Sequence, residues 1–134
     1  MCYCPSRRQV LVAGGVSAGA ALLAGCATDD DEALAPAGET LADLEQMAVG
    51  ESISVQASTG ETVLLTRTGD QDVVAFSAVC THQGCTVEVG EVEGECPCHG
   101  SRFDLTTGEA TAMPASEPLT QIDVEVRDRH VLAL

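Results

Sequence analysis

The chain has 134 residues, of which 6 are basic and 21 acidic, and its formal net charge is −15 at pH 7. This charge excludes nucleic acid as a partner, because the phosphate backbone attracts basic surfaces. With no tryptophan, one tyrosine and two phenylalanines, a large aromatic core is excluded too, so a domain of this size needs additional staples such as a disulfide or a metal.

The first 25 residues are predicted to be an export signal and not part of the fold. Ser6–Leu11 reads SRRQVL, which resembles a twin-arginine motif, and a Gly/Ala-rich run from Val10 to Gly25 follows it. That run has about 16 residues, fewer than the roughly 20 that a membrane-spanning helix needs. We therefore expect export from the cytoplasm, and the alternative is an uncleaved N-terminal anchor.

A lipid attachment site is predicted directly after this signal. Leu23–Cys26 reads LAGC, which resembles the lipobox at which lipoproteins are cut and lipidated on the cysteine. We expect a lipid on Cys26 to hold the protein at the outer face of the membrane. Residues 26–40 are acidic, rich in alanine and without periodicity, so they are predicted to be a flexible tether.

Residues 41–134 are predicted to form one all-β domain, because short runs of alternating apolar and polar residues recur between turn signals. Leu41–Met47 is compatible with either a short helix or an extended lead-in. The predicted strands are Ser52–Gln56, Thr62–Arg67, Val73–Phe76, a hairpin of Thr86–Val89 with the segment around Val92, Arg102–Leu105, Leu119–Val126 and His130–Leu134.

Two short loops carry the metal-ligating residues. Cys80–Cys85 reads CTHQGC and Cys96–Ser101 reads CPCHGS. Thiolates and imidazoles bind soft and borderline metals such as iron and zinc, whereas calcium and magnesium prefer oxygen ligands. Each loop pairs one cysteine with one histidine and holds a further cysteine that a four-ligand site does not need, which suggests a disulfide. The remaining histidine, His130, is expected to be a surface residue.

Zinc is the second candidate metal. A structural zinc site usually combines ligand pairs of the C-x-x-C or H-x-x-x-H kind, and neither spacing is present in these loops. If zinc nevertheless occupied the site, the protein would be a redox-silent structural or interaction module.

The two loops resemble those of the Rieske iron–sulfur proteins, in particular the disulfide-containing branch of higher redox potential. The resemblance extends from about Glu51 to Leu134, and its diagnostic part is confined to the loops and the residues that follow them. It implies a Rieske-type antiparallel β-sandwich with a small cluster-binding subdomain formed by the two loops. It also implies one [2Fe–2S] cluster as the cofactor.

The resemblance assigns roles to the residues of the loops. It implies that Cys80 and Cys96 bind one iron, that His82 and His99 bind the other, and that Cys85 and Cys98 form the disulfide.

Five further residues are expected to lie around the cluster. Gly84 and Gly100 let the backbone turn tightly and approach the cluster. By the same resemblance, Ser101 donates a hydrogen bond to a bridging sulfide, and the stretch containing Pro114 is the third loop, which covers the cluster. Phe103 stands where high-potential members carry a tyrosine whose hydroxyl favours the reduced state, so we expect a lower potential than in the quinol-oxidising complexes.

The implied activity is the transfer of single electrons and not the conversion of a substrate by the chain itself. Two neutral imidazoles in place of two thiolates make a cluster less negative, and such centres have potentials of roughly −150 to +300 mV, against about −400 mV for plant-type ferredoxins. We also expect electron uptake to favour proton uptake at His82 or His99.

Several partners are compatible with this activity. They are a cytochrome, a copper protein, the cytochrome b of a quinol:cytochrome c oxidoreductase with quinol itself, and the large subunit of a molybdenum oxidase. Gln83 replaces the leucine usual at the docking tip of quinol-oxidising members, which favours a free-standing carrier unless Gln83 is simply a tolerated exposed residue. The acidic surface either steers a basic partner or reflects adaptation to salt.

Overall fold

The computed structural model describes residues 34–134; the predicted signal, Cys26 and the first part of the predicted tether lie outside the described residues. The regular elements within this range are strands and one three-residue 3₁₀ helix, which confirms the predicted all-β fold. They are β1 (Thr40–Asp43), η1 (Leu44–Gln46), β2 (Ser52–Gln56), β3 (Thr62–Arg67), β4 (Val73–Ser77), β5 (Glu88–Val89), β6 (Gly94–Glu95), β7 (Arg102–Phe103), β8 (Ala110–Ala112), β9 (Gln121–Ile122), β10 (Val124–Arg127) and β11 (His130–Ala133). Within residues 34–134 no helix has the length and apolar character needed to cross a membrane.

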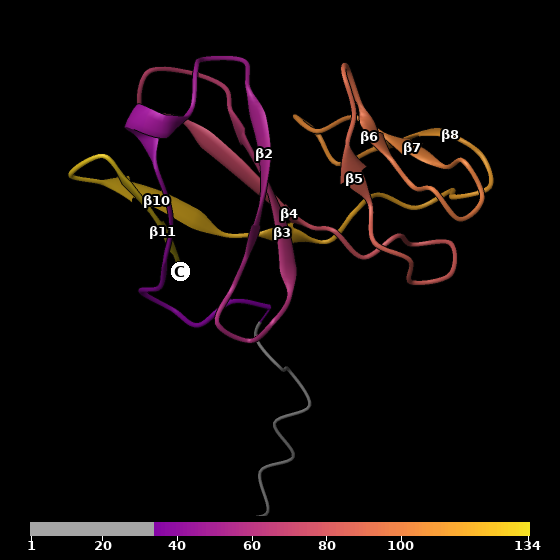
Figure 1. Ribbon diagram of the computed structural model, residues 1–134, viewed down its shortest axis with the longest axis horizontal. Coiled ribbons are helices and arrows are strands. Elements are labelled where there is room, and N and C mark those ends of the chain that lie inside the picture. Colours follow the sequence, from indigo (N-terminus) through magenta and orange to yellow (C-terminus); the bar gives the residue numbers. More distant parts are fainter. Residues whose placement is uncertain (1–33) are drawn as a thin grey trace, which may run out of the picture. The chain divides into compact units, whose positions relative to one another are not determined.

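The strands form three antiparallel sheets. Their orders are β1-β11-β10, β2-β3-β4-β9 and β5-β6-β7-β8. In Figure 1 the β5–β8 sheet, in orange, lies to one side of the strands β2, β3 and β4. We call it the cluster lobe, because both cysteine-bearing loops belong to it, and the other two sheets form the base.

Strand β3 is buried on both of its faces. Val63 and Leu65 belong to the apolar core of the base, whereas Leu64, between them, belongs to the core of the cluster lobe. On the next strand, β4, Ala75 belongs to the core of the base and Phe76 to the core of the cluster lobe. Since successive side chains of a strand point to opposite faces, the β3–β4 pair lies between two cores and joins the lobe to the base.

The structure confirms the bounds of two predicted strands and corrects others. The strands Ser52–Gln56 and Thr62–Arg67 form as predicted. The prediction of one strand over Leu119–Val126 is wrong, because the chain changes sheets at Asp123: Ile122 pairs with β4, whereas Val124 pairs with β11. Alternation of apolar residues continues through such a crossing, so the pattern alone does not reveal it.

The hairpin between the two loops is shorter than predicted. Strand β5 begins only at Glu88, and its partner β6 is Gly94–Glu95. Val92, which the pattern places in the second strand, instead lies at the turn with 89% of its surface exposed. The turn is closed by a hydrogen bond from the Gly90 amide to the Glu93 carbonyl, at 2.9 Å.

The packed part of the chain begins before the predicted start of the domain at residue 41. Ala35 is buried in the core of the base, and the Gly38 amide donates to the Ala133 carbonyl at 2.7 Å. Residues 34–40 therefore belong to the fold and not to a tether. In the lead-in, strand β1 comes first and η1 follows, with the Asp43 side chain accepting a hydrogen bond from the Glu45 amide at the start of η1.

A glycine allows the cluster lobe to pack closely on the base. Gly108 has a φ of +78°, and a Cβ atom placed on it would lie only 2.5 Å from Cε1 of Phe76. The turn that carries it is held by the Asp104 carboxylate, which accepts hydrogen bonds from Thr106 and from the Thr107 amide. Hydrogen bonds from the Thr106 hydroxyl and amide and from the Thr107 amide lower the pKa of Asp104 despite the cost of burial.

The substitution Gly108→Ala tests this contact. We expect it to lower the free energy of unfolding by about 1–2 kcal/mol from the left-handed φ, and by about 1–3 kcal/mol more from overpacking against Phe76. Gly60→Ala is the matched control, since Gly60 has a φ of +89° but no atom within 4 Å of the added Cβ. Denaturant titration of both variants measures the difference, and equal losses would show that the contact with Phe76 is unimportant.

Candidate metal centre

The two loops have the same backbone structure. In the first, the Cys80 amide donates to the Cys85 carbonyl and the Gly84 amide donates to the Cys80 carbonyl, both at 2.8 Å. In the second, the Cys96 amide donates to the Ser101 carbonyl at 2.8 Å and the Gly100 amide donates to the Cys96 carbonyl at 2.9 Å. The loops are therefore equivalent residue by residue, with Cys80 matching Cys96 and Cys85 matching Ser101.

Each loop needs a glycine at its fifth position. Gly84 and Gly100 have φ angles of +75° and +77°, a left-handed conformation that side chains disfavour. Each loop is also closed at its base by paired backbone, the bridge between Val79 and Thr86 for the first and the Glu95–Arg102 pair of β6 and β7 for the second. The loop shapes are thus determined by local hydrogen bonds.

The expected ligands lie in two pairs. The Cys80 and Cys96 side chains belong to the same buried cluster and interact with each other. Both residues have 2% of their surface exposed, and neither is part of a disulfide. The rings of His82 and His99 meet edge to face with their centroids 4.8 Å apart. His82 is half-buried and His99 is exposed. The structure therefore brings thiol to thiol and imidazole to imidazole across the two loops.

Backbone amides of the loops point at both thiols. Burial raises the pKa of the Cys80 thiol, but hydrogen bonds from the His82 amide, the Cys96 side chain, the Gln83 amide and the Ser101 side chain outweigh this, and its pKa is lowered. Burial raises the pKa of the Cys96 thiol, and contact with Cys80 raises it further than the Cys98 and His99 amides can offset. In each loop the amides two and three residues after the cysteine stabilise negative charge on its sulfur.

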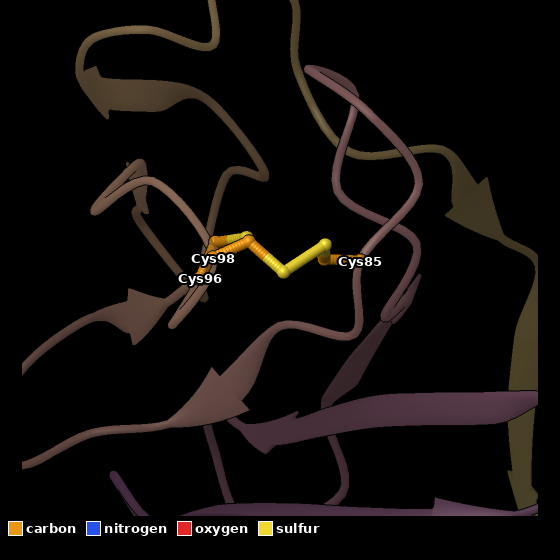
Figure 2. Close-up of side chains that lie close together, drawn as sticks. All are labelled: Cys85, Cys96 and Cys98. Carbon is orange, nitrogen blue, oxygen red and sulfur yellow. A yellow bond between two sulfur atoms is a disulfide. The ribbon is translucent and has the colours of Figure 1, made fainter.

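A disulfide joins the two loops. Cys85 and Cys98 are bonded, with their Cα atoms 6.5 Å apart, and this is the pairing expected from the resemblance. The Sγ atom of Cys96 lies within 4.8 Å of both sulfur atoms of this bond, as Figure 2 shows. Because two of the three sulfurs are bonded to each other, this group shows how near Cys96 lies to the disulfide and is not itself a metal site.

Ser101 connects the second loop to a third. Its fully buried hydroxyl oxygen accepts a hydrogen bond from the Ala115 amide at 3.0 Å, and its proton remains free to point at the Cys80 sulfur. Ala115 directly follows Pro114, so the segment that contains Pro114 is attached to the second loop by this hydrogen bond.

A second contact holds the third loop. The Thr81 hydroxyl donates to the Glu117 carbonyl at 2.8 Å. Thr81 carries no local sequence signal for this role, because the contact spans 36 residues.

Phe103 lies in the core of the cluster lobe. Its side chain is fully buried in the same apolar cluster as Cys80 and Cys96. It pairs with Gly94 across β6 and with Ala110 across β8. The core of the lobe is therefore packed around this ring.

The donor set fits an iron–sulfur cluster of the Rieske type. Two buried thiols and two more exposed imidazoles, on loops whose amides point at the sulfurs, match the mixed Cys₂His₂ ligation of such centres. The alternative with four thiolates is excluded for these loops, because two of their four cysteines are bonded to each other.

Comparison with known proteins gives the same assignment. Residues 40–123 match the family described as the Rieske [2Fe-2S] domain, and the chain therefore belongs to this family. Domains of this family carry one [2Fe–2S] cluster.

Among its relatives is the cytochrome b6-f complex iron-sulfur subunit 2 of Nostoc sp., which is 35% identical over 100 residues, covering 72% of this chain and 53% of that protein. The chain thus spans about half the length of the curated relatives it matches.

Two solved structures extend the comparison. The ferredoxin of carbazole 1,9a-dioxygenase from Nocardioides aromaticivorans IC177 is 32% identical with a TM-score of 0.58, covering 73% of this chain and 97% of that one. The cyanobacterial plasma membrane Rieske protein PetC3 from Synechocystis PCC 6803 is 26% identical with a TM-score of 0.57, covering 74% of this chain and 98% of that one. Both support the Rieske-type fold.

The substitution Phe103→Tyr tests the expected effect of the missing hydroxyl. If the new hydroxyl favours the reduced over the oxidised state by about 1.4 kcal/mol, the midpoint potential rises by roughly 60 mV. Phe76→Tyr is the matched control, because it makes the same chemical change at the other phenylalanine of this core and is expected to alter stability alone. Redox titration measures both, and equal shifts in the two variants would contradict the expectation.

Proposed function

We propose that the protein is a membrane-tethered carrier that transfers one electron together with one proton on the outer face of the membrane. In this proposal Cys80 and Cys96 hold one iron of the cluster, and His82 and His99 hold the other. The observation that carries it is the arrangement of the four side chains, with the two thiols buried together and the two imidazoles in contact nearer to solvent.

The two kinds of ligand have different tasks. Cys80 and Cys96 lie in an apolar core with amides directed at their sulfurs, and this environment excludes water from the thiolates. His99 is exposed, so it offers the shortest route for an electron to a docked partner and for a proton to water or a quinol.

Proton coupling follows from the imidazoles. A bound cluster would supply one-electron redox chemistry at this site, and its net charge would be more negative by one after electron uptake. His82 or His99 therefore holds the proton of its remaining ring nitrogen more tightly in the reduced protein, because nearby positive charge disfavours protonation. The midpoint potential is expected to fall as the pH rises.

The partner is proposed to be a soluble or membrane-bound redox protein. Gln83 is exposed at the tip of the first loop, and a polar tip is less suited to docking at an apolar quinol site. This favours a free-standing carrier that passes electrons to a cytochrome or copper protein. The relative from Nostoc, a cytochrome b6-f complex subunit, supports the second candidate, a subunit of a quinol-oxidising complex. A subunit of a molybdenum oxidase would present the same site.

Redox titration of the purified protein, followed by electron paramagnetic resonance at several pH values, tests the ligands and the mechanism. We expect a Rieske-type signal on reduction and a midpoint well above the roughly −400 mV of plant-type ferredoxins. The midpoint should decrease above neutral pH, and His99→Cys should remove part of this decrease. A midpoint independent of pH would contradict proton coupling, and zinc in place of iron would reduce the protein to a structural module.

The location outside the cytoplasm is proposed on two grounds. A disulfide such as Cys85–Cys98 persists in oxidising surroundings, and the twin-arginine route exports proteins that have already folded around a cofactor. The lipid on Cys26 would then keep residues 34–134 beside the membrane.

Cell fractionation tests the lipid anchor. Cys26→Ser is expected to move the protein from the membrane fraction to the soluble fraction, because the residue that would carry the lipid is replaced. Cys4→Ser removes a cysteine from the predicted signal and should leave the distribution unchanged. Membrane retention of the Cys26→Ser protein would instead indicate an uncleaved N-terminal anchor.

A further inference from the structure

Three sulfur atoms of the two loops form one group. The Sγ atoms of Cys85, Cys96 and Cys98 all lie within 4.8 Å of one another, and Figure 2 shows Cys96 beside the disulfide that joins the other two. Cys80, the other free thiol of the described residues, is not a member of this group. A free thiol near a disulfide can exchange with it, since a thiolate attacks a disulfide sulfur and releases the other one.

The two cysteines of the disulfide have different surroundings. Cys98 is exposed to solvent and Cys85 is half-buried. Cys98 is therefore the better leaving group, because water can solvate its departing thiolate. Cys96 and Cys98 are separated by Pro97 alone, whose ring restricts the backbone between them. A bond between Cys96 and Cys85 crosses from one loop to the other, as the present disulfide does. It avoids the small ring that a bond between Cys96 and Cys98 would close.

We propose that Cys96, when it holds no iron, attacks the sulfur of Cys85 and displaces Cys98. The S–S bond between Cys85 and Cys98 breaks, and a bond between Cys85 and Cys96 forms. Because one S–S bond breaks and one forms, no electrons enter or leave the protein. The proton lost by the Cys96 thiol is balanced by the proton gained by Cys98. The product has one disulfide, as before, and an exposed thiol on Cys98.

This exchange makes the state of the disulfide depend on the cluster. The proposal relies on the assignment of Cys96 as an iron ligand, because a sulfur bound to iron is not available as a nucleophile. Loss of the cluster then takes one of its own ligands out of use, and the site is rebuilt when the Cys98 thiol attacks Cys85 and releases Cys96. The cysteine that is bonded to Cys85 therefore depends on whether the chain holds its cluster: Cys98 when the cluster is present and Cys96 after it is lost.

Disulfide mapping of the full chain tests the proposal. The cluster is removed anaerobically with a chelator and no added thiol, free thiols are alkylated, and peptides are identified by mass spectrometry. We expect loss of the Cys85–Cys98 cross-link, appearance of a Cys85–Cys96 cross-link and alkylation of Cys98. The untreated protein with its cluster should keep Cys85–Cys98 and leave Cys96 unalkylated.

A pair of variants provides the matched control. Cys80→Ser and Cys96→Ser each remove one buried thiol and are both expected to lack the cluster. Cys80→Ser should undergo the exchange, because the three sulfur atoms remain, whereas Cys96→Ser should keep Cys85–Cys98 intact. In denaturant the preference for Cys96 over Cys80 should disappear, which separates exchange in the folded loops from random exchange in an unfolded chain.

Other outcomes overturn the proposal. One is an intact Cys85–Cys98 cross-link in the cluster-free wild-type chain, with Cys80 and Cys96 both alkylated. Another is a new cross-link that joins Cys98 to Cys96, or that contains Cys80 as often as Cys96. Failure of the ligand assignment is distinguishable, because alkylation of Cys96 in the protein that still carries its cluster would disprove that assignment alone.

Discussion

The close approach of the two cysteine-bearing loops is the contact on which this structure depends. Each loop has a shape of its own, set by two backbone hydrogen bonds and a glycine in the left-handed conformation. Neither loop alone offers more than one free thiol and one imidazole. Only the contact between Cys80 and Cys96, with the Cys85–Cys98 disulfide beside it, combines the two halves into a set of four donors.

The base supports this contact through a strand pair that is buried on both faces. Leu64 and Phe76 reach into the cluster lobe, while their neighbours Leu65 and Ala75 complete the core of the base. The lobe is small, and each of its strands has only two or three residues. Its stability must therefore come from this shared packing, from the disulfide, whose contribution is about 2–4 kcal/mol, and from the cofactor.

The site keeps the negative charge of its two buried sulfurs away from water. Amides of both loops and the Ser101 hydroxyl are directed at the buried sulfurs, while His99 lies at the surface. The third loop is attached to both cysteine-bearing loops, through Thr81 and Ser101. An electron-transfer centre needs this combination, because its charge must be stabilised internally while one edge stays open to partners.

The sequence by itself determined the chemistry of the protein. Thiols, imidazoles and glycines at fixed spacing within two six-residue loops specify both the ligand types and the loop shapes, because these depend on neighbours along the chain. The same is true of strands such as Ser52–Gln56 and Thr62–Arg67, whose bounds followed from local alternation and turn residues.

Only the tertiary structure decided how distant segments meet. The change of sheet at Asp123, the exposure of Val92, the packing of residues 34–40 and the Thr81–Glu117 hydrogen bond were not predicted. Each depends on which surface lies opposite, and alternation along the chain reports that a side chain is buried but not what it is buried against. The distance from Cys96 to Cys85 is of the same kind, since the fold and not the spacing brings their sulfur atoms within 4.8 Å of each other.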